Sequence, residues 1–151
     1  MLASSLMQIG RERCAVGDLR NSNMAQIIVY GHKAALAPRI TALSDAIHAA
    51  AVTALQLPAE KRFHRFITLD PEQFITPSDR SIDYTIVAVS IFEGRSAATK
   101  KDFIRQLISN VANIGVTPND LEITITETPR ANWGIRGVPA DELLLNYAVE
   151  V

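Results

Sequence analysis

The side chains of this sequence that could do chemistry are mainly cationic and aromatic. Four arginines fall at expected strand ends or in loops, together with two aromatic residues: Arg65, Arg80, Arg95 and Arg136, with Phe63 and Trp133. An arginine at the mouth of an apolar pocket suits a small carboxylate, because its planar guanidinium can bond both oxygens. The same arginines could instead form ordinary ion pairs with acids: Asp79, Asp83, Glu93 or Glu127.

Established catalytic motifs are missing from the sequence. It has no glycine-rich phosphate loop, no nucleophile elbow and no His/Cys cluster with metal-ligand spacing. His32, His48 and His64 fall on three different expected elements, so no shared metal site is predicted. The single cysteine, Cys14, allows no internal disulfide and fits a reducing cytoplasm. We expect a cytoplasmic protein that needs neither metal nor cofactor.

The backbone nitrogen of Ala25 is a further candidate reactive group. Residues 24–30 (MAQIIVY) are apolar and β-branched, which indicates a buried first strand. If translation begins at Met24, the methionine is normally removed before a small residue, and Ala25 then presents a free amine. If the chain keeps Met1, that nitrogen is an amide and offers no base. We predict that residues 1–23 are an N-terminal extension outside a single domain spanning 24–151.

Composition narrows the class of protein. The 151 residues are 48% hydrophobic and 21% charged, which is typical of a globular domain large enough to bury a core. The net charge of −1 argues against non-specific binding to nucleic acid or to anionic membranes, both of which favour a basic surplus. No apolar run reaches the length of a membrane span.

Hydrophobic periodicity predicts an α+β fold made of a β-α-β unit written twice. Each helix shows an apolar stripe at three- and four-residue spacing and is followed by a hydrophobic-Pro turn. The expected elements are a strand at 26–30, a helix from about Pro38 to Leu55, a strand at 64–69, a strand at 83–92, a helix from Ser96 to Gly115 and a strand at 121–126. A short extended piece is expected at 73–76, an arm or hairpin at 133–137, a helical turn at 141–145 and a terminal strand at 147–151.

Two helices can cover only one face of the resulting four-stranded mixed sheet. Along 86–91 the residues on both faces are apolar or small, so the uncovered face must also be buried. Another copy of the chain is the natural cover, and we predict a homo-oligomer that assembles through the sheet.

Several short motifs, in their order and spacing, resemble the tautomerase superfamily. They include the strand directly after Met24, the helix segment LSDAIHAA at 43–50, FEGRS at 92–96 and WGIRG at 133–137. The branch that these segments resemble most contains malonate semialdehyde decarboxylase and cis-3-chloroacrylic acid dehalogenase. The resemblance implies a homotrimer whose strands face its interior. It also implies a reactive N-terminal proline on the first strand and arginines near the second helix that hold a substrate carboxylate.

Carried over residue by residue, this pattern is incomplete. Ala25 stands at the proline position, and Arg95 matches the arginine just before the second helix. The other arginine of that pair would fall at Phe92 or Glu93, so it is missing. Lys61 stands where the resemblance implies a water-activating carboxylate.

The remaining site residues also come from the resemblance and from the arginine pattern. His48 matches a substrate-binding helix histidine, and its structural alternative is a partly buried histidine. Trp133 matches a pocket aromatic, and its alternative is a core or interface anchor. We predict Ala25 and Arg95 as catalytic residues, and His48, Arg80, Trp133 and Arg136 as substrate-binding residues.

The resemblance implies a keto–enol tautomerase, an isomerase with a lyase side activity, acting on a small 2-oxo or enol carboxylate. A free α-amine titrates near neutral pH, and burial beside Arg95 would lower its pKa. An amine on Ala25 could therefore act as acid and base. Two alternatives stay open: a non-catalytic trimer that binds a small carboxylate, and a structural trimer whose arginines form interface ion pairs.

Overall fold

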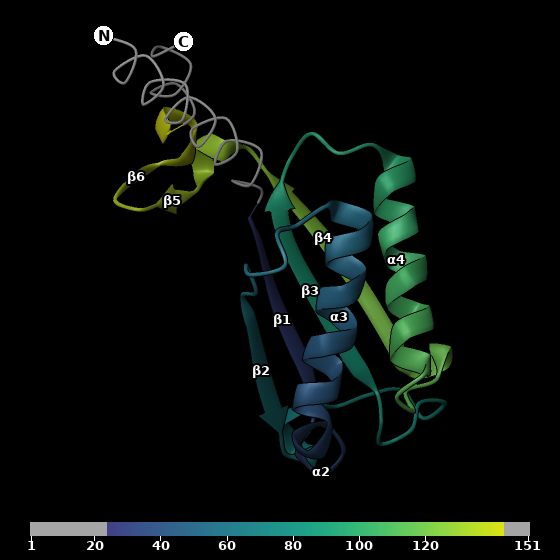
Figure 1. Cartoon of the computed structure of the whole chain (residues 1–151). Helices are drawn as coiled ribbons and strands as arrows, with labels where there is room; N and C mark the ends of the chain where they lie inside the picture. Colours follow the sequence, from purple (N-terminus) through teal and green to yellow (C-terminus); the bar gives the residue numbers. More distant parts are fainter. Residues whose placement is uncertain (1–23, 144–151) are drawn as a thin grey trace, which may run out of the picture.

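In the computed structural model, which describes residues 24–143, a four-stranded sheet carries two long helices on one face (Figure 1). The sheet order is β2-β1-β3-β4. Its elements are β1 (Ala25–His32), α2 (Lys33–Leu36), α3 (Ile40–Leu55), β2 (His64–Leu69), β3 (Thr85–Phe92), α4 (Ala97–Ala112) and β4 (Leu121–Thr128). Short 3₁₀ helices are η1 (Ala37–Arg39), η2 (Pro71–Gln73), η3 (Pro118–Asp120) and η4 (Arg130–Asn132). No helix in the described part is long and apolar enough to span a bilayer.

The predicted tandem repeat is confirmed. β1 and β2 are parallel and are joined through α3, while β3 and β4 are parallel and are joined through α4. The two units meet where β1 pairs with β3 in antiparallel orientation, with Ala25 opposite Ile91 and Gly31 opposite Thr85. The start of each unit therefore lies beside the end of the other unit's first strand.

The core lies between the sheet and the two helices. Residues four apart on each helix point at the sheet: Leu43, Ile47 and Ala51 on α3, and Phe103, Leu107 and Val111 on α4. Alternate residues of the two central strands face the helices: Ile27 and Val29 on β1, and Val87, Val89 and Ile91 on β3. All of these side chains are almost completely excluded from solvent, which accounts for the two periodicities in the sequence.

The helix ends follow the expected signals, with one difference. Ser96 caps α4, because its Oγ accepts a hydrogen bond from the Thr99 amide at 3.1 Å. Gly115 follows α4 with a φ of 102°, a conformation that favours glycine. The first helical segment begins earlier than predicted, at Lys33, and passes through η1 before α3. Proline in the first turn of η1 is compatible with this continuous path.

Each unit ends in the same way, which the periodicity did not reveal. A 3₁₀ turn begins two residues after the last strand, and an aromatic residue follows it: Phe74 after η2 and Trp133 after η4. Each aromatic ring packs on the last residue of its unit's first strand. Phe74 lies 4.9 Å from the His32 ring, and Trp133 lies 4.9 Å from the Phe92 ring. The extended piece predicted at 73–76 forms no strand: Gln73 ends η2, which starts with a capping box at Asp70, and residues 74–76 are irregular.

The chain then leaves the sheet as the arm predicted from 133–137. The arm is a two-stranded hairpin, β5 (Gly134–Ile135) and β6 (Val138–Pro139), at the end of the sheet where β1 begins (Figure 1). Positive φ at Arg136 and Gly137 gives the tight turn between them. Residues 140–143 are helical, consistent with the predicted turn at 141–145. The predicted terminal strand and the N-terminal extension lie outside the described residues.

Asp120 fixes the loop that leads into β3. This side chain is 6% exposed, and its carboxylate accepts hydrogen bonds from the Ser81 amide, at 2.8 Å, and from the Ser81 hydroxyl. These bonds hold the pKa of Asp120 below its usual value. A carboxyl whose pKa is lower in the folded state stabilises the fold above its unfolded pKa, and the contribution is lost as pH falls.

We expect Asp120→Asn to lower the free energy of unfolding at pH 7 by about 1–3 kcal/mol, because the amide cannot accept both bonds. Urea denaturation measures this loss, and the difference from the wild type should shrink at acidic pH. Asp102→Asn, on the exposed face of α4, is the matched control. An equal effect of the two substitutions would contradict the role of Asp120.

Candidate active site

The start of β1 lies in a buried position at one end of the sheet. Ala25 is 5% exposed and stands opposite Ile91, so it lies close to the point where β3 ends at Phe92. The loop from β3 to α4 begins there and carries Arg95. The end of α3 lies at the same place, because the Arg95 Nη2 is 3.5 Å from the Leu55 carbonyl oxygen. Local sequence and the antiparallel register thus bring Ala25 and Arg95 to the same end of the sheet.

Arg95 is half-buried and has no acid bound to it within residues 24–143. The nearest acid in electrostatic terms, Glu127, is held by the Lys100 Nζ at 2.5 Å. Burial lowers the pKa of the Arg95 guanidinium; Glu127 opposes this effect and Arg130 adds to it. A guanidinium stays charged even so, and this one is poorly compensated, which is what an anion site requires.

Aromatic side chains form one wall beside this edge. Phe92 is 2% exposed, and the Trp133 ring meets it edge-on at an interplanar angle of 72°. The Trp133 indole N–H donates to the Thr128 hydroxyl, which fixes the ring. The Arg130 guanidinium lies over the other ring of the pair, 5.3 Å from the Phe92 centroid. Arg130 could not be identified from the sequence, because its position depends on how β4 pairs with β3.

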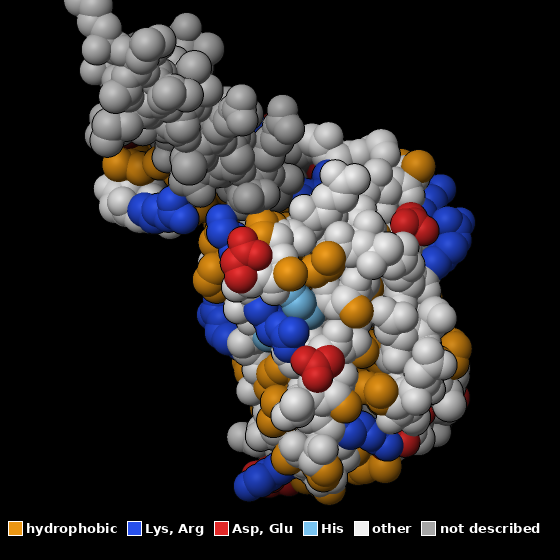
Figure 2. Space-filling model, in the orientation of Figure 1, with side chains coloured by type: hydrophobic (Ala, Val, Ile, Leu, Met, Phe, Trp, Pro, Cys, Tyr) orange, Lys and Arg blue, Asp and Glu red, His pale blue; other side chains and the backbone are white. Residues whose placement is uncertain are grey.

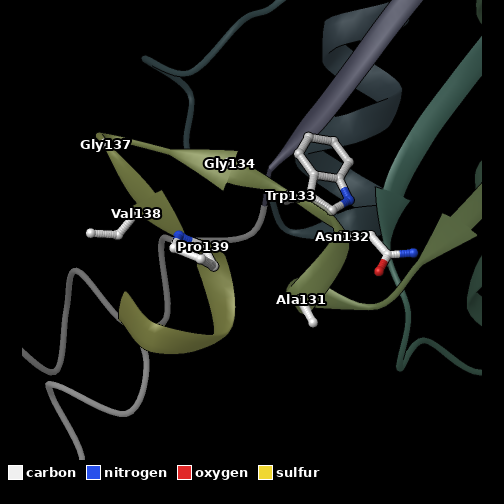
Figure 3. A pocket seen from close by; sticks show the side chains of 7 residues that line it. All are labelled: Ala131, Asn132, Trp133, Gly134, Gly137, Val138 and Pro139. Atoms are coloured by element: carbon white, nitrogen blue, oxygen red, sulfur yellow. The ribbon is translucent and has the colours of Figure 1, made fainter.

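The arm lines an open hollow next to the Phe92–Trp133 ring pair. Its volume is about 490 Å³, and its lining is Ala131, Asn132, Trp133, Gly134, Gly137, Val138 and Pro139. In Figure 3 the Trp133 indole points back to the main sheet, away from Val138. The hollow is lined mostly by small and apolar groups, and neither Arg95 nor Arg130 is among them.

A histidine cluster lies on the other side of Ala25, between α3 and β2. The Ser44 Oγ is 2.9 Å from the His64 Nδ1, and Arg62 donates to the same hydroxyl at 3.3 Å. Since Arg62 supplies a donor, the hydroxyl proton of Ser44 is available for the His64 Nδ1. Arg62 is also paired with Asp45 at 2.6 Å. Figure 2 shows basic side chains next to a histidine, with acidic side chains nearby, on the face of the molecule that carries the helices.

The sequence of this chain matches a known protein family and a known relative. The family described as "Tautomerase enzyme" matches residues 61–136, half of the chain. A probable tautomerase from Ralstonia nicotianae is 34% identical over 55 residues, which are 36% of this chain and 79% of that protein.

The chain belongs to the tautomerase family.

Solved structures agree with this assignment at the level of the fold. A malonate semialdehyde decarboxylase is 23% identical with a TM-score of 0.70, over 80% of this tautomerase and 97% of that chain. A second malonate semialdehyde decarboxylase, inhibited by 3-bromopropiolate, is 26% identical with a TM-score of 0.65, over 80% and 95%. A member of the cis-3-chloroacrylic acid dehalogenase family is 21% identical with a TM-score of 0.65, over 80% and 89%. The predicted resemblance to this branch is therefore confirmed.

The structure of this tautomerase brings some predicted site residues together and separates others. Ala25, Arg95 and Trp133 lie at the same end of the sheet. Arg136 is exposed at the tip of the arm. Residue 61, where the resemblance implies a carboxylate, is a lysine in the turn before β2.

His48 is buried on α3, with 6% of its surface exposed. Its Nε2 lies 2.7 Å from the Ala59 carbonyl oxygen, so this nitrogen carries the proton and donates it. The bond ties α3 to the turn that leads into β2. Because Nε2 is used in this bond, only the Nδ1 of His48 remains for the substrate-binding role predicted for this residue.

Arg80 lies at the opposite end of the sheet. It pairs with Asp79 at 2.8 Å and with Glu122 at 3.6 Å, and it stacks on Tyr84, just before β3. That end of β3 faces Gly31, so about 20 Å of strand separates Arg80 from Ala25. One small molecule cannot contact both within a single chain. A substrate-binding role for Arg80 at the Ala25 site would require a second subunit.

The His64 cluster makes a pH-dependent prediction. Burial, together with electrostatic interactions with Arg62 and His48, lowers the pKa of His64 from 6.5 to about 4. Because the unfolded histidine binds a proton between these values and the folded one does not, stability should fall as pH drops from 6.5 to 4.

We expect His64→Gln to remove part of this dependence. Its unfolding free energy should lose about 1–2 kcal/mol less than that of the wild type between pH 6.5 and 4, after allowance for solvent screening of a half-exposed ring. Urea denaturation at several pH values measures the difference. Parallel curves for the two proteins would show that His64 is not responsible.

Proposed function

We propose that this tautomerase transfers a proton on a small 2-oxo or enol carboxylate. The observation that carries the proposal is the meeting of a buried strand start with an uncompensated cation: Ala25 and Arg95 share one edge, and no acid in residues 24–143 is paired with Arg95. Family membership supports enzymatic activity in general. The substrate class comes from the guanidinium, whose fork matches a carboxylate.

In the proposed reaction the amine of Ala25 is both base and acid. It removes the proton from the carbon next to the 2-oxo group, and the released electron pair forms the enol double bond. The resulting ammonium then gives its proton to the oxygen, which regenerates the neutral amine. The reverse transfer restores the ketone, so no co-reactant is consumed. Arg95 holds the carboxylate and keeps the reacting carbon near the amine. Burial and the charge of Arg95 both favour the neutral, basic form of this amine.

The route requires Ala25 to be the first residue of the working chain. Where residues precede it, the nitrogen is an amide and can only donate a hydrogen bond. Alanine also lacks the rigid ring of proline, so its amine is positioned less firmly than a proline would be. We therefore propose a slow enzyme rather than an efficient one.

A non-catalytic protein that binds a small carboxylate is the second candidate. Alanine at position 25 and the absence of an arginine at Phe92 or Glu93 favour it. Such a protein would show a ligand-induced rise in melting temperature with pyruvate or malonate but no turnover of any 2-oxo acid.

Substitution of Arg95 tests the proposed function. With a chain that begins at Ala25, we expect Arg95→Gln to lower kcat/KM for phenylpyruvate ketonisation by about 10–100-fold, because one charge-assisted pair is lost. The enol absorbance of phenylpyruvate follows the rate. Arg105→Gln, on the exposed side of α4, is the control and should leave the rate unchanged. Equal rates for wild type and Arg95→Gln would remove Arg95 from the mechanism.

We also propose that the working unit is a homotrimer built on the open face of the sheet. No described helix covers this face (Figure 1). Its central residues carry no charge: Ile28, Tyr30, Ile86, Ala88 and Ser90. A fused 4-OT structure described as an asymmetric trimer has the same fold, with a TM-score of 0.69 over 78% of this chain and 98% of that one. Burial of apolar surface would drive the association.

Sedimentation tests the trimer. The wild type should sediment as a trimer at micromolar concentration, and Ile28→Lys should shift it to monomer, because a charge would be buried in the interface. Ile75→Lys is the control, since Ile75 is 89% exposed in a loop and lies off the sheet. A monomeric wild type would contradict the proposal.

A further inference from the structure

Arg130 is a cation for which the described part of the chain provides no acid. It is the first residue of η4, and its Cζ lies 5.3 Å from the centroid of the Phe92 ring. Its Nε is buried and has no hydrogen-bond partner among residues 24–143, and no ion pair to it is formed there. A buried guanidinium nitrogen without a partner costs stability unless a ligand or another group satisfies it.

Arg130 and Arg95 lie at the same end of the sheet, each just after one of two neighbouring strands. Arg95 follows the end of β3 by three residues, and Arg130 follows the end of β4 by two. These strand ends are adjacent, because Phe92 pairs with Thr128. The positive charge of Arg130 contributes to the lowered pKa of Arg95, so the two guanidiniums lie close enough to repel. Glu127 cannot neutralise both, because Lys100 already holds it.

The internal repeat indicates that Arg130 is not needed for the scaffold. The equivalent position in the first unit, two residues after the end of β2, is Pro71. The first unit's ring pair, His32 and Phe74, forms at the same 4.9 Å separation as Phe92 and Trp133. Among residues 24–143 no guanidinium lies over either ring of that first pair; Arg80 lies over the neighbouring Tyr84 instead. The 3₁₀ turn and its aromatic residue therefore form without an arginine at this position. An unpaired arginine that the fold does not require is better explained by a ligand.

We propose that Arg130 is a substrate-binding residue that acts with Arg95 on the carboxylate of the substrate. This inference rests on the proposed function and extends it by one residue. Phe92, one of the two positions at which the expected second arginine is missing, provides the ring over which the Arg130 guanidinium lies. The second guanidinium thus reaches the site from the strand beside β3, instead of from the loop after β3. Two forks around one anion favour a carboxylate over a neutral isostere of the same shape.

Trp133 gives a direct readout of ligand binding at this edge. It is the only tryptophan in the chain, and it shares the Phe92 ring with Arg130. Its fluorescence can be followed while the full chain is titrated with malonate, which does not absorb at the excitation wavelength. Malonamide, which is neutral and of similar shape, is the ligand control.

We expect malonate, and not malonamide, to change the fluorescence saturably in the wild type. Arg130→Gln and Arg95→Gln should each raise the Kd for malonate by about tenfold or more, because each removes a charge-assisted pair. Arg105→Gln should leave the Kd unchanged. Arg130→Lys keeps the charge but loses the two-pronged guanidinium, so it should give an intermediate Kd. This variant also replaces Arg130→Gln if that protein does not fold. In that case a Kd for Arg130→Lys equal to that of the wild type would overturn the inference.

The outcomes separate this inference from the proposed function. If Arg95→Gln weakens malonate binding and Arg130→Gln does not, Arg130 has no part in the site and the proposed function stands. If neither substitution weakens binding, or if neither malonate nor pyruvate binds saturably to the wild type, the carboxylate site itself is absent and both proposals fail.

Discussion

The antiparallel pairing of β1 with β3 is the constraint on which the rest of the structure depends. It joins two β-α-β units that would otherwise each expose a hydrophobic edge, and it places Ala25 opposite Ile91. The same register puts the end of β3, and with it Arg95, beside the start of β1. A shift by one residue would turn either Ile27 and Val29 or Val87 and Val89 away from the helices and expose part of the core. The core packing that selects this register therefore also sets the positions of Ala25 and Arg95.

Electrostatics distinguish the two ends of the sheet. At the end near Gly31, Arg80 is neutralised by Asp79 and Glu122. At the Ala25 end, Lys100 pairs with Glu127, and the half-buried guanidiniums of Arg95 and Arg130 form no ion pair with a carboxylate in residues 24–143. Partial burial strengthens the attraction of such cations for an anion, because water screens them less. The internal repeat thus yields two similar ends, of which one is charge-balanced and the other is suited to bind an anion.

The sequence was sufficient for the architecture because its periodicities are local. The apolar stripes of α3 and α4, the Ser96 cap and the glycine after α4 all act within a few residues. Arg95 could be placed because it follows a strand directly. The position of Arg130, the Ser44–His64 contact and the Arg80–Glu122 pair could not be predicted, since each joins elements that are 20 or more residues apart in the sequence. The matching 3₁₀ turns were hidden because Asp-Pro and Pro-Arg start the same turn with different residues.

The central claim is that the nitrogen of Ala25 is the reactive group. Its most direct test compares two forms of this tautomerase, one beginning at Ala25 and one retaining residues from Met1, with intact mass confirming each first residue. The account predicts phenylpyruvate ketonisation above the buffer rate only for the form with a free Ala25 amine, and loss of that rate when the amine is acetylated. Equal rates for the two forms would contradict it, because an amide nitrogen cannot serve as the base.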